Sequence, residues 1–370
     1  MSGRNASDPA DGTAADGPAA FGFGVISDVQ YADADDEMPK HGTMTRHYRG
    51  ALDVLSRAVD YFNGFAFPLA FVAQLGDLID GRCAKAGASE RALAAVLEHI
   101  RRSAAPFVHL VGNHELYNFD RETLATRLGT RPAGRAVEFY ATAPAVGWRV
   151  LVLDAFQEAV IGRPSADPQR ERAVAFLRAK RHEHGRPSDA HPDDWYAGLA
   201  DEARRFSPMN GAFGARQIQW LSSQLEDAAA SGERLILLSH VVLHPNACHG
   251  TTMAWDYQAA LDAIERGPPG VVAAVFCGHE HKGGYHHDPT TGVHHVTICS
   301  PLNQGSAGSA FGVVLAFADR LEVHSPRLDS LLMPDDLVRA ATSGGGGVSA
   351  SASGGVLSLA LPRRDGRTVA

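Results

Sequence analysis

The chain has 370 residues, of which 45% are apolar and 21% charged, and its formal net charge is −8. These values are typical of a globular enzyme with one large core or two domains, and the acidic balance argues against nucleic-acid binding through a broad basic surface. No run of about 18 apolar residues occurs, so no membrane span is expected.

Apolar runs and helical periods alternate along the chain. Strands are expected at Phe23–Ser27, Leu69–Leu75, Phe107–Val111, Leu235–Leu238 and Val271–Cys277, with further sheet at Gly292–Ser300 and Phe311–His324. Helices are expected at Thr43–Asn63, Ser89–Arg102, Ala215–Ala230 and Trp255–Arg266. The pattern predicts an α/β fold in which a pair of mixed sheets is flanked by helices.

The two ends of the chain differ in composition from the middle. Residues 1–20 are expected to form a disordered leader, and the Gly/Ser-rich residues 336–370 a flexible tail, in which Val356 to Leu361 forms either a docking strand or nothing. The remainder, 21–335, is predicted as one domain, with the polar segment 162–210 as an insertion and a candidate lid. The four cysteines are scattered, which favours a reducing, cytoplasmic location over a disulfide framework.

Five polar clusters directly follow five of the expected strands. They are Asp28-Val29-Gln30, Gly76-Asp77-Leu78-Ile79-Asp80, Gly112-Asn113-His114-Glu115, Ser239-His240 and Gly278-His279-Glu280-His281. A strand holds its last residues rigidly, and the loop beyond it is free to carry polar groups. Gathered at one sheet edge, these oxygen and imidazole ligands would suit two divalent cations without thiolate.

This ligand set predicts a two-metal site for in-line displacement at phosphorus, with Asp77 as the bridging carboxylate. Asp28, Gln30 and one terminal histidine would complete the first ion, whereas Asn113, His240 and the other terminal histidine would complete the second. Ordinary alternatives are capping carboxylates, a capping amide, a turn asparagine and a core histidine. Because His279 and His281 are two residues apart, a bend is needed for both to reach different ions.

In this order the clusters resemble the motifs of the calcineurin-like metallophosphoesterase superfamily, over the span from Asp28 to His281. The resemblance implies a four-layer α/β/β/α sandwich with a dinuclear site, in which His279 binds the second ion and His281 the first. Most of the superfamily has histidine in place of Gln30, and the glutamine form is similar to the manganese-dependent ADP-ribose/CDP-alcohol diphosphatase branch. Other stretches are similar to that branch, among them Arg46-His47-Tyr48-Arg49 and Asn210-Gly211-Ala212-Phe213, whereas Lys282 replaces an expected acidic or polar residue.

His114 is the candidate for chemistry beyond the metals, because it follows an expected ligand. It could protonate the leaving oxygen or donate a hydrogen bond to a phosphoryl oxygen, and the alternative is a histidine that only caps the loop. Arg46, Tyr48 and Trp255 are weaker candidates for substrate binding: Arg46 for the second phosphate and Trp255 for a nucleobase, with surface and core roles as alternatives. Asp80 is expected to orient a neighbour. The pairs His286-His287 and His294-His295 are interpreted as surface or strand residues rather than a third metal site.

The predicted function is a hydrolase that cleaves the pyrophosphate bond of ADP-ribose or CDP-alcohols by means of a hydroxide held between two divalent ions. Manganese is the expected metal, with iron, zinc and magnesium as alternatives. A small nucleoside diphosphate conjugate is the expected partner, with no nucleic acid, membrane or protein partner. One rival is a phosphodiesterase for cyclic nucleotides or phospholipid-derived diesters, and another is a metal-binding interaction module without catalysis.

Overall fold

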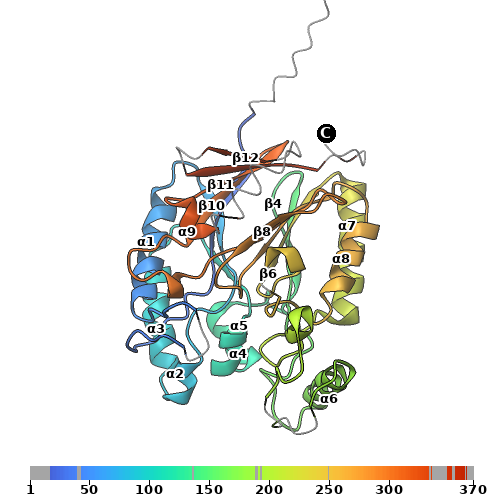
Figure 1. Ribbon diagram of the computed structural model, residues 1–370. Coiled ribbons are helices and arrows are strands. Elements are labelled where there is room, and N and C mark those ends of the chain that lie inside the picture. The colour runs from blue at the N-terminus through green and yellow to red at the C-terminus, as the bar shows by residue number, and fades with distance from the viewer. Residues whose placement is uncertain are drawn as a thin grey trace, which may run out of the picture.

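The structure is a computed structural model. It describes residues 17–39, 43–135, 137–187, 191, 194–248, 250–332, 335, 348–351, 355–362 and 364. Two mixed sheets pack face to face, and helices cover the outer face of each sheet (Figure 1). The predicted α/β/β/α sandwich is therefore confirmed. Among the described residues, no helix is both long and apolar enough to cross a membrane.

The first sheet has the strand order β12-β13-β11-β10-β1-β2-β3. Its strands are β1 (Phe21–Ile26), β2 (Leu69–Gln74), β3 (Phe107–His109), β10 (Phe311–Ala316), β11 (Arg320–His324), β12 (Val348–Ser351) and β13 (Val356–Ala360). Strands β1, β2 and β3 are parallel, whereas β10 is antiparallel to β1. Helices α1 (Gly50–Gly64) and α3 (Ser89–Ile100) lie on the outer side of this sheet (Figure 1).

The second sheet has the order β4-β5-β6-β7-β9-β8. Its strands are β4 (Tyr140–Ala145), β5 (Trp148–Val152), β6 (Arg234–Ser239), β7 (Val272–Cys277), β8 (Gly284–His287) and β9 (His294–Thr297). Strands β5, β6, β7 and β9 are parallel, and α7 (Gly214–Ser231) and α8 (Tyr257–Arg266) cover the outer side (Figure 1). The remaining helices are α2 (Arg82–Lys85), α4 (Asn113–Asn118), α5 (Arg121–Leu128), α6 (Pro168–Glu183) and α9 (Leu328–Leu331).

Aromatic side chains join the two sheets. Phe23 of β1 meets Phe276 of β7 edge-to-face with ring centroids 5.7 Å apart, and Phe21 meets Trp148 of β5 at 5.8 Å. Each large side chain removed from water in this way contributes about 1.5–3 kcal/mol. This packing holds the ends of β1 and β7, and the loops that follow them, in a fixed relationship.

Several segments differ from the sequence prediction. The helix predicted from Thr43 begins only at Gly50, because backbone hydrogen bonds tie Arg46 to Glu37 and His47 to Leu302. Strands β4 and β5 and helix α5 were not predicted. Residues 356–360, for which the sequence left a docking strand as one alternative, do pair with β11 as strand β13 and bury Leu357 and Leu359. Residues 1–16 of the expected leader and most of the expected tail lie outside the described residues.

Candidate active site

The predicted metal ligands follow strands whose carboxyl ends meet at one edge of the sandwich. Asp28 follows β1, Asp77 follows β2, His240 follows β6 and His279 follows β7. Within the described residues, one set of three ligand side chains has all its ligand atoms within 4.8 Å of one another, namely Asp77, His240 and His279. The side chains of the expected ligands are almost fully buried, apart from that of His281, which is 18% exposed.

Asp77 lies between two groups of these side chains. Its Oδ2 atom is 3.1 Å from Nε2 of Gln30 and 3.4 Å from Nε2 of His240. On the Gln30 side, Nε2 of His281 lies 2.8 Å from the Gln30 amide nitrogen and 3.6 Å from Oδ1 of Asp28. On the other side, Oδ1 of Asn113 lies 3.1 Å from Nε2 of His240. A central carboxylate between two sets of donors is the arrangement that a bridged pair of cations requires.

The backbone of the site is strained. Asp28, Gln30, Asp77 and His279 have φ values of 51°, 44°, 63° and 66°, and among the described non-glycine residues only Asp201 shares this left-handed region. Each such residue costs on the order of 1–3 kcal/mol, and such strain clusters at functional sites. At His279 the positive φ supplies the bend that separates its side chain from that of His281.

Glu115 organises the loops around Asp77. Its carboxylate accepts hydrogen bonds from the backbone nitrogens of Asp77 and Leu78, each at 2.7 Å, and from that of Gly112 at 2.8 Å. Burial and the nearby Asp77 raise the pKa of Glu115 to about 7, whereas the backbone bonds act in the opposite direction. A Cβ atom at Gly112 would lie 2.2 Å from Oδ1 of Asp77, so this close approach requires glycine.

The buried charges favour an ionised Asp77. Burial would raise the pKa of Asp77, but the imidazoles of His240 and His114 outweigh it and hold the pKa well below its usual range. Burial likewise disfavours the charged form of His240, yet Asp77 and Asp28 raise the pKa of that imidazole to about 9. Burial lowers the pKa of His279, so this ring is neutral. Asp77 and His240 thus form a buried ion pair in the absence of a competing cation.

The donor set fits a pair of divalent cations. Gln30 points its Nε2 atom at the two aspartates, and its Oε1 atom is buried without a hydrogen-bond partner. The two ends of a carboxamide have nearly the same shape, so a half-turn of this amide would place the oxygen between the carboxylates and His281. Oxygen and imidazole donors of this kind suit manganese, iron, zinc or magnesium.

His114 lies beside Asp77 with its ring orientation fixed. The backbone N–H of Gly81 donates to Nδ1 of His114 at 2.7 Å, so the hydrogen of the neutral ring is on Nε2. That Nε2 atom lies 3.9 Å from Oδ2 of Asp77. Asp80 accepts the backbone N–H of Arg82 with Oδ1 at 2.9 Å, and its Oδ2 atom lies 3.4 Å from Nδ1 of His114, so its expected orienting role stays a prediction. His114 therefore presents a hydrogen-bond donor to the site.

A pocket of about 530 Å³ opens beside His114. It is lined by Arg46, Asp80, Gly81, Arg82, Ala84, Lys85, His114 and Tyr117. Three of these side chains, those of Arg46, Arg82 and Lys85, are cationic, although the chain has a net charge of −8. Tyr48 does not line this pocket: it is buried, its ring lies 3.8 Å from the Arg82 guanidinium, and its hydroxyl accepts from Arg82 at 2.7 Å. The predicted substrate contact of Tyr48 is therefore replaced by support of Arg82.

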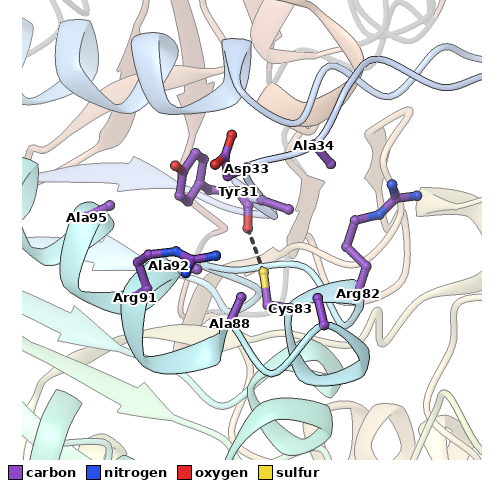
Figure 2. Close-up of a pocket in the computed structure, with 11 residues that line it drawn as sticks. Tyr31, Asp33, Ala34, Arg82, Cys83, Ala88, Arg91, Ala92 and Ala95 are labelled. Carbon is purple, nitrogen blue, oxygen red and sulfur yellow. Dashed lines mark hydrogen bonds between the residues drawn. The ribbon is translucent and has the colours of Figure 1, made fainter.

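A second pocket, of about 380 Å³, is also lined by Arg82 (Figure 2). Small side chains, among them Ala88, Ala92 and Ala95, form much of its wall, and Tyr31 and Arg91 also line it. Figure 2 shows the thiol of Cys83 facing the carbonyl oxygen of Tyr31, at 3.5 Å. Because Tyr31 directly follows Gln30, this apolar space borders the segment that carries an expected ligand.

Burial bears on two other predictions. Trp255 is only 4% exposed and packs with Phe206 and Leu177 in a small apolar cluster of its own, so it is a core residue and not a platform for a nucleobase. His294 and His295 are buried strand residues of β9. Burial lowers the pKa of His294 to about 3, which keeps this ring neutral.

A family model described as calcineurin-like phosphoesterase matches residues 21–283. The chain belongs to the calcineurin-like phosphoesterase family. The resemblance predicted from the five polar clusters is thus confirmed, and this phosphoesterase also has relatives that match most of its length.

Two sequence relatives and one structure are especially informative. The manganese-dependent ADP-ribose/CDP-alcohol diphosphatase of Arabidopsis thaliana is 35% identical over 306 residues, which cover 82% of this chain and 93% of the relative. The Homo sapiens protein of the same name is 33% identical over 314 residues, which cover 81% and 88%. The crystal structure of a dimetal phosphatase from Danio rerio superposes with a TM-score of 0.75 at 30% identity and covers 83% of this chain and 96% of its own.

Sequence reasoning missed three side chains that support the phosphoesterase site. Glu115 was noted without a role, although an acidic residue three positions after Gly112 at a helix start is a capping pattern that the sequence does display. Asn303 holds Nδ1 of His281 with its Oδ1 atom at 2.7 Å, and Asn210 lies at the same distance from Nε2 of His279. Nothing local in the sequence marks either asparagine as a partner of a histidine far away in the chain.

Proposed function

We propose that this phosphoesterase is a manganese-dependent hydrolase of the pyrophosphate bond in nucleoside diphosphate conjugates, with ADP-ribose and CDP-alcohols as substrates. The relatives that match most of the chain carry this activity in their names. The proposal includes Asp28, Gln30, Asp77 and His281 as the ligands of the first ion. Asp77 is shared with the second ion, whose other ligands are Asn113, His240 and His279.

The observation that carries the proposal is the cationic pocket beside His114. A diphosphate has two phosphoryl groups, and only one of them can lie at Asp77. Arg46 and Lys85 line the space next to His114, where the second phosphoryl group would lie. Guanidinium and ammonium groups suit such an anion. A simple phosphodiester has no second phosphoryl group to place beside these cations.

The chain's own residues have distinct tasks in this reaction. Two divalent ions, when bound by these residues, would supply charge neutralisation at the phosphoryl oxygens and activation of the attacking water. Asp77 fixes the position of both groups of ligands. His114 donates from Nε2 to a phosphoryl or leaving oxygen, where the charge grows in the transition state. Arg46 and Lys85 hold the part of the substrate that departs.

The cellular setting is part of the proposal. The four cysteines form no disulfide within the described part of the chain, which fits a reducing compartment, and we infer a cytoplasmic location. The partner is a small nucleotide conjugate rather than a macromolecule.

Product analysis tests the proposed reaction. Protein stripped of metal with a chelator should be inactive, and added manganese should restore conversion of ADP-ribose to AMP and ribose 5-phosphate, and of CDP-choline to CMP and phosphocholine. Cyclic AMP and bis-p-nitrophenyl phosphate serve as diester comparisons. Full activity of the stripped protein, or turnover of cyclic AMP alone, would contradict the proposal.

A matched pair of variants tests the pocket. Lys85→Ala should raise KM for ADP-ribose and leave KM for bis-p-nitrophenyl phosphate unchanged, because only the diphosphate reaches the cations. Arg101→Ala removes one positive charge from the exposed C-terminal end of helix α3, outside the pocket, and should alter neither value.

A further inference from the structure

The Nε2 atom of His279 is hydrogen-bonded to Asn210, the last residue of the 162–210 insertion. Nε2 of His279 lies 2.7 Å from Oδ1 of Asn210, and both side chains are buried. The amide group of Asn210 has a fixed orientation, because its Nδ2 atom donates to the carbonyl oxygens of Arg205 at 2.9 Å and Thr251 at 2.7 Å. The amide oxygen therefore faces His279, and Nε2 of the ring is the donor.

This bond decides which nitrogen of His279 is available to a cation. A neutral imidazole has one N–H and one nitrogen with a lone pair. Since Nε2 donates to Asn210, the lone pair is on Nδ1. The backbone of the residue is fixed as well, because its N–H donates to Oδ2 of Asp28 at 2.8 Å. Acceptors of this kind set the orientation and basicity of metal-ligating histidines.

The hydrogen bond from Asn210 to the Arg205 carbonyl connects Asn210 to the packed part of the insertion. The Arg205 whose carbonyl it holds packs its guanidinium 4.1 Å from the ring centre of Phe206. Phe206 belongs to an apolar cluster separate from the main core, together with Leu177 of α6 and Trp255. The indole N–H of Trp255 donates to the carbonyl of Ser207 at 3.1 Å, which ties the cluster to the segment that leads into Asn210.

We propose that Asn210 is a positioning residue that makes binding of the second ion depend on the packing of the insertion. The inference rests on the ligand set of the proposed function, but not on which diphosphate is cleaved. Its physical basis is that the ring of His279 has one rigid acceptor, and that acceptor belongs to the insertion. Loosening of the small apolar cluster would displace the Arg205 carbonyl, one of the two acceptors that orient the Asn210 amide, and so loosen the orientation of His279.

The other two histidines provide the matched comparison, because their acceptors lie outside the insertion. Nδ1 of His240 bonds the carbonyl of Leu75 at 2.7 Å, and Nδ1 of His281 bonds Oδ1 of Asn303 at 2.7 Å. Asn303 is oriented as Asn210 is, since its Nδ2 atom donates to the carbonyl of Thr45 at 2.9 Å. Asn303→Ala thus removes the same chemistry from the histidine of the first ion.

The first experiment measures ring orientation and metal affinity. Nitrogen NMR of histidine-labelled, metal-free protein should show His279 protonated on Nε2 in the wild type and on a mixture of nitrogens in Asn210→Ala. Calorimetric titration with Mn²⁺ should show one ion weakened about 10–100-fold in Asn210→Ala, and the other weakened in Asn303→Ala. Asn210→Gln, which displaces the amide by one methylene, should weaken the same ion as Asn210→Ala.

The second experiment tests the dependence on the insertion. Leu177→Ala opens a cavity in the apolar cluster and should weaken the second ion in the wild-type background, but add nothing in the Asn210→Ala background. Leu359→Ala, an equally buried change in β13, should leave both affinities unchanged. Wild-type affinities and an unchanged His279 signal in Asn210→Ala would overturn the inference. Absence of metal binding by the wild type would instead refute the proposed ligand set.

Discussion

The Nε2 atom of His240 lies 3.4 Å from Oδ2 of Asp77, and neither side chain has any exposed surface. The carboxylate keeps a proton on the imidazole and raises the pKa of His240 to about 9. Only the unprotonated nitrogen has a lone pair for a cation. A proton and the second metal ion therefore compete for the same atom.

From this competition we expect metal binding to release a proton at any pH below about 9. Since His240 is protonated below its pKa, manganese affinity should rise with pH, by about tenfold per unit while one proton is displaced, and level off above about 9. Calorimetry in two buffers of different ionisation enthalpy counts the protons released. Equal heats in the two buffers would show that His240 is already neutral.

Asp77→Asn should remove at least one ion per chain and abolish turnover while the protein stays folded. The amide keeps an oxygen that can accept the His114 backbone N–H, as Oδ1 of Asp77 does at 2.8 Å, but it lacks the charge that two cations share. Mass spectrometry of the purified variant gives the metal content. Asp227→Asn, on the exposed face of α7, is the control, and full occupancy with normal turnover in Asp77→Asn would remove Asp77 from the bridge.

His114→Ala should retain both ions and lower kcat by about 10²–10⁴, the range for a positioned acid or donor. A p-nitrophenolate leaving group needs no proton. If His114 acts on the leaving oxygen, the decrease in kcat should therefore be smaller for a p-nitrophenyl substrate than for ADP-ribose. Comparison of kcat for ADP-ribose and bis-p-nitrophenyl phosphate measures this. Equal losses would assign His114 to holding a phosphoryl oxygen, to which its Nε2 donor is equally suited.

Gln30→His should bind the first ion more tightly, because imidazole is a stronger donor than a neutral carboxamide. We also expect the preference to shift from nucleoside diphosphate conjugates towards simple phosphodiesters. Metal titration and kcat/KM for ADP-ribose and bis-p-nitrophenyl phosphate check both effects. Identical values in the two proteins would mean that Gln30 carries no information about the substrate.

Glu115→Gln should lower both thermal stability and manganese affinity. The carboxylate accepts three backbone N–H groups, and an amide must turn an NH₂ group towards at least one of them. The NH₂ group would then face a backbone N–H group, and both are donors. The buried backbone N–H would lose its hydrogen bond, which costs about 1–3 kcal/mol of stability. Thermal melting with and without manganese separates the two effects. Glu122→Gln, on the surface of α5, should change neither.

The sequence predicted those parts of the site that depend on local patterns. Apolar runs that end in polar clusters located Asp28, Asp77 and His240, because a strand and the loop after it are neighbours in the chain. The conformation of residues 43–49 was missed because it depends on partners such as Leu302, far away in the sequence. Strands β4 and β5 were missed because Pro144, Gly147 and several alanines weaken the alternation.

Side chains were misjudged where exposure decides their role. Tyr48 and Trp255 have side chains of the kind that contact ligands. The neighbouring sequence does not show that Arg82 covers the Tyr48 ring, or that Leu177 and Phe206 of the 162–210 segment pack against Trp255. The hydrogen-bond acceptors of the histidine rings could not be predicted either, because they come from distant parts of the sequence. An asparagine that holds His281 from position 303 is visible only once the chain is folded.

Strand β13 has a consequence for the solubility of the protein. It pairs with the whole length of β11, with Leu321 opposite Leu359 and Val323 opposite Leu357. A chain shortened before residue 356 would present β11 as an open edge of unpaired N–H and carbonyl groups above an apolar face, which is a template for self-association. Strand β12, next to β13, lies at the opposite end of the sandwich from α4, which carries Asn113 and His114 (Figure 1). Loss of the last residues should therefore produce oligomers whose phosphoesterase centre is still intact.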